Sequence, residues 1–506
     1  MTLTGVFATL AIVMAQPESQ PLVQTQQGVL AGRVEGEVAS FKNIPYAAPP
    51  VAEMRWRPPG PAPIWEGQRD ASAYGHLCIQ APPNGDPGVG PLPMSEDCLN
   101  LNVWRSVGGD QSAPVMVWIH GGGLVNGSGT APLYDGTNLA KRGMVVVTLN
   151  YRLGRLGFFD HPALAAERPA GEEAGNYGLM DVIAALKWVR ANIAAFGGDP
   201  ANVTIFGESA GGAIVARMMI SPPAQGLFDR AIIQSGLGRE LQTPLDRKGP
   251  HGAPSARERG EVWAYGAGLR TAADLRTAPP EMFLTPPPVF ANGDLSLIDG
   301  RIVPSTVEAA FKAGRQAPVP LIIGTNSAEF WWMRPTDRNG YGQIDDDMTW
   351  LERADAVQAY GGLEAFDRLS ITDLVFSEPA RMLARLHNKA GHPAWLYRFD
   401  ISSPQNPEPH GGATHAIERP YVFGTLNTLP YPVEDRDRQA SEAMIGYWTA
   451  FARSGDPNGV GRVEWPRARA GDTRLINFGN AGPTATPVPF SGRLDLLERF
   501  RDRPRP

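Results

Sequence analysis

The sequence predicts an α/β fold in which a large, mostly parallel sheet is covered on both faces by helices. Short apolar runs typical of buried strands recur at residues 113–120, 143–154 and 202–206. Between the last two lies 178–196, whose apolar residues recur at steps of three and four, the spacing of an amphipathic helix. Strands that alternate with helices favour a parallel sheet, because each crossover places a helix on one face.

Further elements are predicted on both sides of this segment. Residues 22–48 alternate turn signals with short apolar runs, as N-terminal hairpins do. Later in the chain, strands are predicted at 230–236, 319–326 and 393–400, and a helix-like run at 379–390. Residues 237–300 are irregular, which indicates a lid or pocket-wall insertion. Because neither an internal repeat nor a linker is evident, 16–506 is expected to form one domain.

The composition disfavours two classes of partner. The chain has 46 Lys and Arg against 52 Asp and Glu, a formal net charge of −6, and it contains no long basic stretch. Nucleic acid and anionic membrane surfaces are therefore not expected to bind. The 57 glycines and 48 prolines indicate many loops, yet they stay below the level typical of disorder. A monomer is the expected state.

The N-terminus resembles the core of a signal peptide. Residues 5–15 are apolar and end in small residues, which predicts cleavage after Ala15 and export to the periplasm or the medium. The first basic residue is Arg33, so the usual positive segment is missing. The alternative is therefore an ordinary N-terminus on a cytoplasmic protein. No other segment approaches the roughly 20 apolar residues of a membrane span.

The chain has two cysteines, Cys78 and Cys98, separated by a Pro- and Gly-rich stretch typical of an exposed loop. In an exported protein we expect them to form a disulfide. Closing a loop of this length stabilises the folded chain by roughly 3 kcal/mol in the chain-entropy model. In a cytosolic protein they would be two free thiols.

The stretch GESAGG (207–212) places Ser209 in the pattern G-x-S-x-G. In this pattern the serine lies on a tight turn between a strand and a helix, where glycines avoid clashes. Apolar residues at 203–206 and 213–216 supply both flanks. The pattern alone leaves two interpretations open: a nucleophilic serine of an α/β-hydrolase fold, or a serine at an ordinary bend.

A serine hydroxyl becomes a nucleophile when an imidazole removes its proton. In an α/β-hydrolase the chain order is serine, acid, histidine. Six of the eight histidines do not fit this order. Three precede Ser209: His76, His120 and His161. His251 falls in the insertion, and His387 and His392 lie within or just after the helix-like run. Of the two that remain, His415 is preferred to His410, because an apolar anchoring stretch follows it.

The acid should follow a strand that lies between the serine and the base. Glu329 comes a few residues after the apolar run that ends at Ile323, whereas Asp337 and the aspartates at 345–347 lie further out in polar sequence. A glutamate after a strand is usually a solvated charge. The case for Glu329 therefore depends on the other elements.

A glycine triplet, Gly121 to Gly123, follows His120 at the end of the predicted strand 113–120. An oxyanion hole needs backbone N–H groups that point at the tetrahedral intermediate, and glycines let a substrate carbonyl approach closely. A glycine-rich turn is the alternative. In combination with GESAGG, the triplet favours a serine hydrolase.

With these motifs, most of residues 22–480 resembles the type-B carboxylesterase family, which includes cholinesterases and bacterial para-nitrobenzyl esterases. The matching stretches include NIPYAAPP, SEDCLNLNV, WIHGGG, NYRLG, FGESAGG, IIQSG, GTNSAE, GATHAIERPYVFG and FARSGDPN.

The resemblance implies a role for each matching residue. Ser209 would be the nucleophile, Glu329 the acid and His415 the base. The oxyanion donors would be the N–H groups of Gly122, Gly123 and Ala210. Three further features would match the family: a disulfide between Cys78 and Cys98, a salt bridge between Arg55 and Glu96, and a contact of Ser235 with the acid.

The sequence also departs from the family. Cholinesterases carry a tryptophan between those two cysteines to stack on choline, whereas residues 79–97 contain no aromatic residue. Choline esters are therefore not the expected substrates. Leu124 replaces the phenylalanine usual after the glycine triplet, and Val182 stands where glutamine is common. Both changes concern the shape of the pocket.

The sequence thus predicts a serine carboxylic-ester hydrolase that works through an acyl-enzyme and needs no metal or organic cofactor. Candidate pocket residues are Leu124, Leu237, Phe330, Trp331 and Trp332; ordinary core packing is their alternative role. If Arg239 or Arg334 faced the pocket, esters with an anionic acyl group, such as the tricarballylate esters of fumonisin-type toxins, would be favoured. The competing functions are a non-catalytic, cholinesterase-like adhesion or binding protein, and a lipase or amidase on the same fold.

Overall fold

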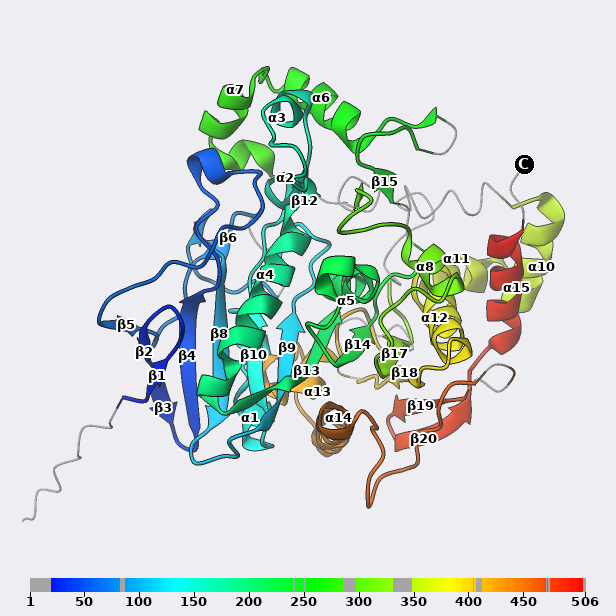
Figure 1. The fold of residues 1–506 in the computed structure, drawn as a ribbon. Helices are drawn as coiled ribbons and strands as arrows, with labels where there is room; N and C mark the ends of the chain where they lie inside the picture. The colour runs from blue at the N-terminus through cyan, green and yellow to red at the C-terminus, as the bar shows by residue number, and fades with distance from the viewer. Residues whose placement is uncertain are drawn as a thin grey trace, which may run out of the picture.

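The computed structural model describes most of the chain, and Figure 1 shows its ribbon. The described residues are 20–81, 87–239, 242–249, 252–284, 297–330, 348–403, 405, 412–469, 471 and 474–503. Several features predicted from the sequence lie outside these ranges: the apolar N-terminal segment 5–15, Trp331, Trp332, Arg334 and His410.

An eleven-stranded mixed sheet forms the centre of the molecule. From one edge to the other the strands are β20 (Gly482–Pro487), β19 (Arg474–Gly479), β18 (Ala394–Asp400), β17 (Leu321–Asn326), β14 (Arg230–Gln234), β13 (Gly198–Glu208), β9 (Ala113–Ile119), β10 (Val145–Leu149), β8 (Asn100–Ser106), β4 (Val38–Pro45) and β3 (Arg33–Glu35). All neighbours from β19 to β10 are parallel, and the pairs at both edges are antiparallel. The predicted mostly parallel sheet is confirmed.

Side chains that alternate along the central strands enter two separate cores. On β9, Val115, Val117 and Ile119 belong to one core, whereas Met116 and Trp118 belong to the other. The two cores lie on opposite faces of the sheet, because successive side chains of a strand point to opposite sides. Both faces are therefore buried, which explains why these strands are apolar throughout rather than alternating with polar residues.

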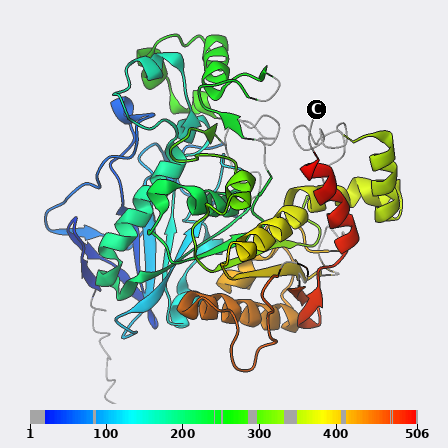
Figure 2. The ribbon, with the colours of Figure 1, turned by 45° about the vertical axis from the view of Figure 1, so that its right-hand side comes forward.

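Helices cover both faces (Figures 1 and 2). The core with Val115 includes residues of α4 (Tyr177–Asn192), α5 (Ala210–Ile220), α8 (Val307–Lys312) and α12 (Glu378–Lys389). The core with Trp118 includes residues of α1 (Thr137–Lys141), α13 (Arg419–Phe423) and α14 (Asp435–Ser454). The C-terminal helix α15 (Ser491–Asp502), red in both views, packs beside α12 and α10 (Trp350–Tyr360).

Smaller sheets and short helices complete the fold. The small sheets are β1 (Leu22–Gln24) with β2 (Val29–Ala31) and β5 (Gln68–Asp70), β6 (Leu77–Cys78) with β7 (Met94–Ser95), β11 (Phe158–Phe159) with β12 (Gly175–Asn176), and β15 (Thr243–Pro244) with β16 (Leu297–Ile298). Two antiparallel pairs, β1 with β2 and β3 with β4, are the predicted N-terminal hairpins.

Two elements differ in extent from the prediction. The strand predicted at 143–154 ends at Leu149, because the backbone N–H and side chain of Arg152 bind Asp181 on α4 and draw the chain out of the sheet. The helix predicted at 178–196 is α4 followed by a 3-10 turn, Ile193–Phe196. It ends at Gly197, whose φ of +78° is the left-handed conformation that glycine favours.

The insertion predicted as irregular contains two helices, α6 (Ala256–Gly266) and α7 (Ala272–Thr277). Each begins with a capping box, Ser255 with Glu258 and Thr271 with Asp274, in which the side chains and backbone N–H groups satisfy each other. The expectation of irregular structure is therefore wrong for these residues. Both helices lie at the top of the molecule in Figure 1, next to α3 (Pro162–Ala166).

The predicted salt bridge fastens this insertion to the N-terminal part of the chain. Arg55 pairs with both carboxylate oxygens of Glu96, at 2.7 and 2.6 Å. Its remaining amino group donates to the carbonyl oxygens of Leu275, within α7, and Ala278, which directly follows that helix. The arginine side chain is 5% exposed, so its charge is compensated inside the protein.

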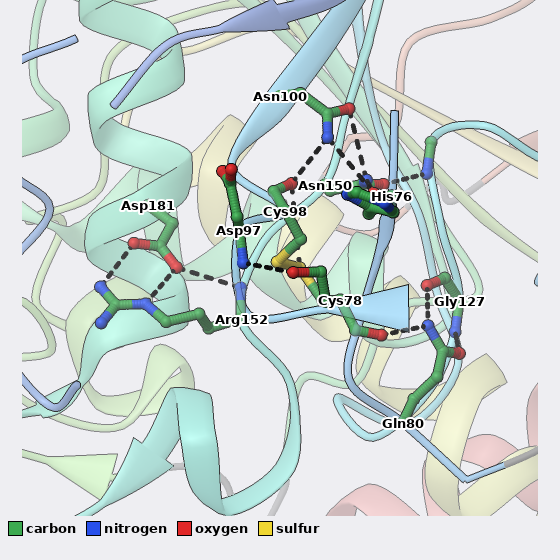
Figure 3. Close-up of a disulfide and its surroundings, with 12 residues drawn as sticks. His76, Cys78, Gln80, Asp97, Cys98, Asn100, Gly127, Asn150, Arg152 and Asp181 are labelled. Atoms are coloured by element: carbon green, nitrogen blue, oxygen red, sulfur yellow. Dashed lines mark hydrogen bonds and ion pairs between the residues drawn. A yellow bond between two sulfur atoms is a disulfide. The ribbon is translucent and has the colours of Figure 1, made fainter. Parts of the chain in front are cut away.

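A disulfide joins Cys78 to Cys98, as predicted (Figure 3). Next to it, Gln80 donates from Nε2 to the carbonyl oxygens of Cys78 and Gly127, and its Oε1 accepts from the N–H of Gly127. Gly127 lies four residues after Gly123. Gln80 therefore joins the segment of Cys78 to the loop that follows the glycine triplet.

Within the described ranges, no helix combines the length and the apolar character needed to cross a membrane. The same part of the chain contains no group of three His, Cys, Asp or Glu side chains placed to hold a metal ion.

Replacing both cysteines, Cys78→Ala with Cys98→Ala, should lower the free energy of unfolding by roughly 3 kcal/mol, because the unfolded chain regains the entropy of an open loop. Denaturant unfolding without reductant measures this loss. Gln80→Ala, which keeps the disulfide, should cost only about 1–2 kcal/mol for its lost hydrogen bonds. A double cysteine variant as stable as the unmodified protein would contradict the prediction.

Candidate active site

Ser209 lies on a sharp turn between β13 and α5, as the GESAGG pattern predicts. Its backbone has φ +56° and ψ −123°, a conformation that is strained for a residue with a side chain. The N–H of Ser209 donates to the carbonyl oxygen of Gln234 on the neighbouring strand β14, at 2.9 Å. The carbonyl of Ser209 accepts from Ala213 in the first turn of α5. These bonds hold the turn between its two flanking elements.

The glycines of this turn are required by close contacts. A Cβ atom on Gly211 would lie 2.0 Å from the carbonyl oxygen of Ile119, and one on Gly207 would lie 2.6 Å from the carbonyl carbon of Gly211. A Cβ atom on Gly212 would meet the carbonyl oxygen of Gln234 at 2.8 Å. Only glycine permits the end of β9 and the start of α5 to approach this closely.

Ser209, His415 and Glu329 form one line of hydrogen bonds. The Oγ atom of Ser209 lies 2.8 Å from Nε2 of His415. The Nδ1 atom of the same ring lies 2.6 Å from Oε2 of Glu329. The imidazole can therefore donate to the carboxylate from Nδ1 and accept the serine proton on Nε2. The structure thus brings together three residues that are far apart in the sequence.

Glu329 is completely buried, and its carboxylate is held from two sides. Oε1 accepts hydrogen bonds from the Oγ of Ser235 and the backbone N–H of Asn326, both at 2.7 Å. Oε2 is left to accept from His415. Ser235 therefore contacts the candidate acid, as the family resemblance implies.

Backbone contacts bring the loop of the acid to the loop of the base. Ala328 forms an isolated β-bridge with Thr414, and the N–H of His415 donates to the carbonyl oxygen of Glu329 at 3.3 Å. The Oγ of Ser327 accepts from the N–H of Ala413 at 2.8 Å. The first loop follows β17 and the second follows β18, two parallel neighbours. Because their carboxyl ends meet at one edge of the sheet, the loops lie side by side.

The glycine triplet lies directly beside the serine turn. A Cβ atom on Gly121 would lie 3.2 Å from the Cβ of Ser209. Gly122 and Gly123 have φ of +101° and +62°, and an added Cβ on Gly122 would clash with Asn126. Among the described residues, none accepts a hydrogen bond from the N–H groups of Gly122, Gly123 or Ala210. These three donors therefore remain available on the two segments that meet at Ser209.

Two buried carboxylates at this site were not singled out from the sequence. Glu208, within GESAGG itself, has Oε1 3.3 Å from Nε2 of His415. Within the described part of the chain, no group donates a hydrogen bond to either of its carboxylate oxygens. Glu418 accepts from Nε2 of Gln234 at 3.1 Å and from Nδ2 of Asn326 at 2.7 Å. Asn326 thus touches both Glu418 and the acid Glu329.

The buried carboxylates change the proton affinity of the histidine. Burial alone would lower the pKa of His415, but the negative charges of Glu208 and Glu329 outweigh it and raise the pKa to about 9. Burial raises the pKa of Glu208 to about 8, against the opposing effect of His415 and Arg419. Burial and the neighbouring Glu329 also raise the pKa of Glu418. The site therefore favours a proton on His415.

An apolar wall lies beside the imidazole. The ring centroids of Phe330 and Phe376 are 4.6 and 5.2 Å from that of His415. Both phenylalanines are buried in a cluster with Ile371 and Val375, against which the predicted pocket residue Leu237 packs. Leu124 is also buried, and its carbonyl oxygen accepts from Gly154.

The positive charge of Arg239 is already paired with carboxylates of the protein and is not free to bind a substrate as the hypothesis required. Its guanidinium pairs with Glu378, Glu308 and Asp502, and its side chain is 3% exposed. The hypothesis that Arg239 recognises an anionic acyl group is therefore not supported.

Comparison with known proteins shows the family of the whole chain. A model of the "Carboxylesterase family" matches residues 19–365 and 363–487. A relative named "Fumonisin B1 esterase" from Sphingopyxis macrogoltabida is 36% identical over 500 residues, covering 94% of this chain and 89% of that protein. "Para-nitrobenzyl esterase" from Bacillus subtilis is 37% identical over 470 residues, covering 88% and 92%. A solved structure titled "PNB ESTERASE" superposes with a TM-score of 0.81 at 32% identity, covering 94% of this chain and 100% of the other.

Glu208→Gln should move the acid limb of the pH profile of kcat/KM for ester hydrolysis to lower pH, by about one unit. The reason is that removing this negative charge lowers the pKa of His415, so the imidazole is free to accept a proton at lower pH. Initial rates measured across pH with one ester test this. Glu442→Gln, which removes an exposed carboxylate paired with Arg142, is the control and should leave the profile in place. An unmoved profile in Glu208→Gln would contradict the role assigned to its charge.

Proposed function

Because this chain belongs to the carboxylesterase family and is a carboxylic-ester hydrolase, we propose that it works through an acyl-enzyme formed on Ser209. The observation that carries this proposal is the line of hydrogen bonds from Ser209 through His415 to Glu329, with distances of 2.8 and 2.6 Å. A hydroxyl, an imidazole and a buried carboxylate in this order are the parts of a nucleophilic relay.

In the first half of the reaction, Oγ of Ser209 attacks the ester carbonyl carbon while its proton passes to Nε2 of His415. Glu329 holds the ring in the tautomer that leaves Nε2 free, and its charge stabilises the imidazolium that forms. The tetrahedral intermediate then expels the alcohol oxygen, which takes the proton back from Nε2. The acyl group remains on Ser209 as an ester.

In the second half, a water molecule gives a proton to Nε2 of His415 and attacks the acyl carbon. The second intermediate releases Oγ of Ser209, which recovers its proton from Nε2, and the carboxylic acid departs. The relay therefore ends each turnover in its starting state.

The N–H groups of Gly122, Gly123 and Ala210 are the proposed donors to the oxyanion in both halves. Support comes from their place beside Ser209 and from the absence of other acceptors for them among the described residues. Donors that are fixed before the reaction stabilise the developing charge without reorganising, and losing one such donor costs about 3–4 kcal/mol of the barrier in related chemistry.

We propose neutral esters with an apolar acyl group as the main substrate class. The described surroundings of His415 include the phenylalanine wall, and an apolar wall favours an uncharged acyl group because burying a charge against it is costly. Esters of polycarboxylic acids, such as tricarballylate esters of the fumonisin type, are the second candidate. They are favoured by the relative named as a fumonisin esterase.

Export is proposed on one observation, the disulfide between Cys78 and Cys98, because such bonds persist in oxidising compartments.

Ser209→Ala should abolish ester turnover while the fold stays intact, since only the Oγ atom is lost. Hydrolysis of a chromogenic ester and the circular-dichroism spectrum give the two readouts. Turnover close to that of the unmodified protein would overturn the assignment of the nucleophile.

A panel of esters that share one alcohol and differ only in acyl charge should separate the two substrate candidates. We expect kcat/KM for a neutral acyl group to exceed that for an anionic group of the same size by at least about tenfold, the effect of one uncompensated charge near the site. A preference for the anionic member would favour the second candidate.

A further inference from the structure

Arg239 connects four parts of the chain through its buried guanidinium. Its Nε and one amino group contact both carboxylate oxygens of Glu378, each at 2.8 Å. The other amino group contacts Glu308 on α8 at 2.6 Å and Asp502 at the end of α15 at 2.8 Å. The segment after β14 is thereby tied to α12, α8 and the C-terminal helix. Figure 2 shows these helices together on one side of the sheet.

The carboxylate of Glu378 lies at one end of an unusual helical turn. Residues Asp373–Ser377 form a single π-helical turn between α11 (Leu363–Thr372) and α12. Pro379 follows directly, and it has no N–H to donate and would crowd the preceding turn of a regular helix. The wider π-turn accommodates it.

The other end of the π-turn is also held by an ion pair from α15. Arg493 Nε lies 3.0 Å from Oδ2 of Asp373, and the hydroxyl of Tyr360 donates to the same oxygen at 2.8 Å. Both ends of the π-turn are therefore anchored to the C-terminal helix: Asp373 through Arg493, and Glu378 through the Arg239 guanidinium that also binds Asp502.

The two segments joined by Arg239 and Glu378 carry the apolar wall of the site. Leu237 stands two residues before Arg239, and Phe376 stands two residues before Glu378. Leu237 packs against the cluster that contains Phe376 and Phe330. Phe376 is fully buried and faces the ring of His415 at 5.2 Å. The ion pair thus fastens the segment of Phe376 just behind its contact with the histidine, and the segment of Leu237 just behind its packing against the same cluster.

We propose that Arg239 is a positioning residue for His415. Its bidentate pair with Glu378 holds Phe376 in place, with Leu237 packed behind it, and Phe376 in turn fixes the imidazole between Ser209 and Glu329. The inference rests on the proposed role of His415 as the base. It assigns Arg239 to the reaction itself, through packing, rather than to recognition of an anionic substrate.

General energetics favour positioning over a purely stabilising role. Burying an arginine and a glutamate removes both from water, and such a pair is often no more stable than apolar residues of the same volume. What the pair supplies is a fixed relative orientation of the two segments, because a planar guanidinium and a carboxylate fit together in one bidentate geometry. A small displacement of a catalytic group lowers the rate strongly. Side chains that hold the imidazole of His415 in one position are therefore expected to raise kcat.

Arg239→Gln tests the proposal, with kcat, KM and the melting temperature as readouts and a p-nitrophenyl ester as the probe. We expect kcat to fall about tenfold while KM changes less than about twofold, because binding surfaces remain but the base is misplaced. Arg239→Lys, which keeps the charge, should recover part of the loss in kcat.

Arg381→Gln is the matched control. Arg381 is about as buried, at 4% exposure, and ties α12 to α15 through Asp495 and Glu498, but it lies beyond the π-turn. It should lower the melting temperature by a similar amount and leave kcat within about twofold, as a stabilising ion pair far from the chemistry does. Equal losses of kcat in the two glutamine variants, or no loss in Arg239→Gln, would overturn the proposal.

Should Arg239→Gln fail to fold, Asp502→Asn provides the second test. Asp502 is partly exposed, so this change weakens the anchor without burying an unpaired charge. It should lower kcat in the same direction by a smaller factor, and an unchanged kcat would count against Arg239 as a positioning residue. Ser209→Ala distinguishes the two proposals. Retained ester turnover in Ser209→Ala refutes the proposed roles of Ser209 and His415. An inactive Ser209→Ala together with an unchanged kcat in Arg239→Gln refutes only the positioning role of Arg239.

Discussion

The hydrogen bond between His415 and Glu329 is the interaction on which the rest of the site depends. It joins two loops that follow neighbouring parallel strands, β17 and β18, and a β-bridge between Ala328 and Thr414 fixes their distance. The serine turn after β13 meets the same edge because β14 alone separates it from β17. The carboxyl ends of parallel strands lie at the same edge of a sheet. The order of β13, β14, β17 and β18 therefore brings Ser209, Glu329 and His415 close together.

Burial of negative charge is the second constraint. Glu208, Glu329 and Glu418 all lie within the protein near one imidazole, and each is fully buried. Such a cluster is tolerated because each carboxylate has a different compensation: Glu329 has hydrogen bonds from Ser235 and Asn326, Glu418 has two side-chain amides, and Glu208 faces His415 and Arg419. The cost of this arrangement is a histidine that holds its proton more tightly than a free imidazole would.

Much of the fold and of the candidate site could be predicted from the sequence, since short-range patterns carry the strands, α4 and the serine turn. Glu208 escaped notice because the motif treats its position as variable, and only its burial reveals its charge as part of the site. The helices α6 and α7 were missed although their capping boxes, Ser255 with Glu258 and Thr271 with Asp274, are visible in the sequence. The setting of Arg239 could not be foreseen, because its partners stand at positions 308, 378 and 502.

The distances along the chain have a consequence for how activity arises during synthesis. The contact of Ser209 with His415 spans 206 residues, and that of His415 with Glu329 spans 86. A chain emerging from the ribosome can form the serine turn well before either partner exists, and during that interval the proposed base, His415, has not yet been made. Folds that depend on contacts of such long range form slowly, because the entropy of closing long loops is lost before the contacts are made. With the proposed roles of these residues, catalysis would begin only after β17, β18 and the loop of His415 have joined the sheet.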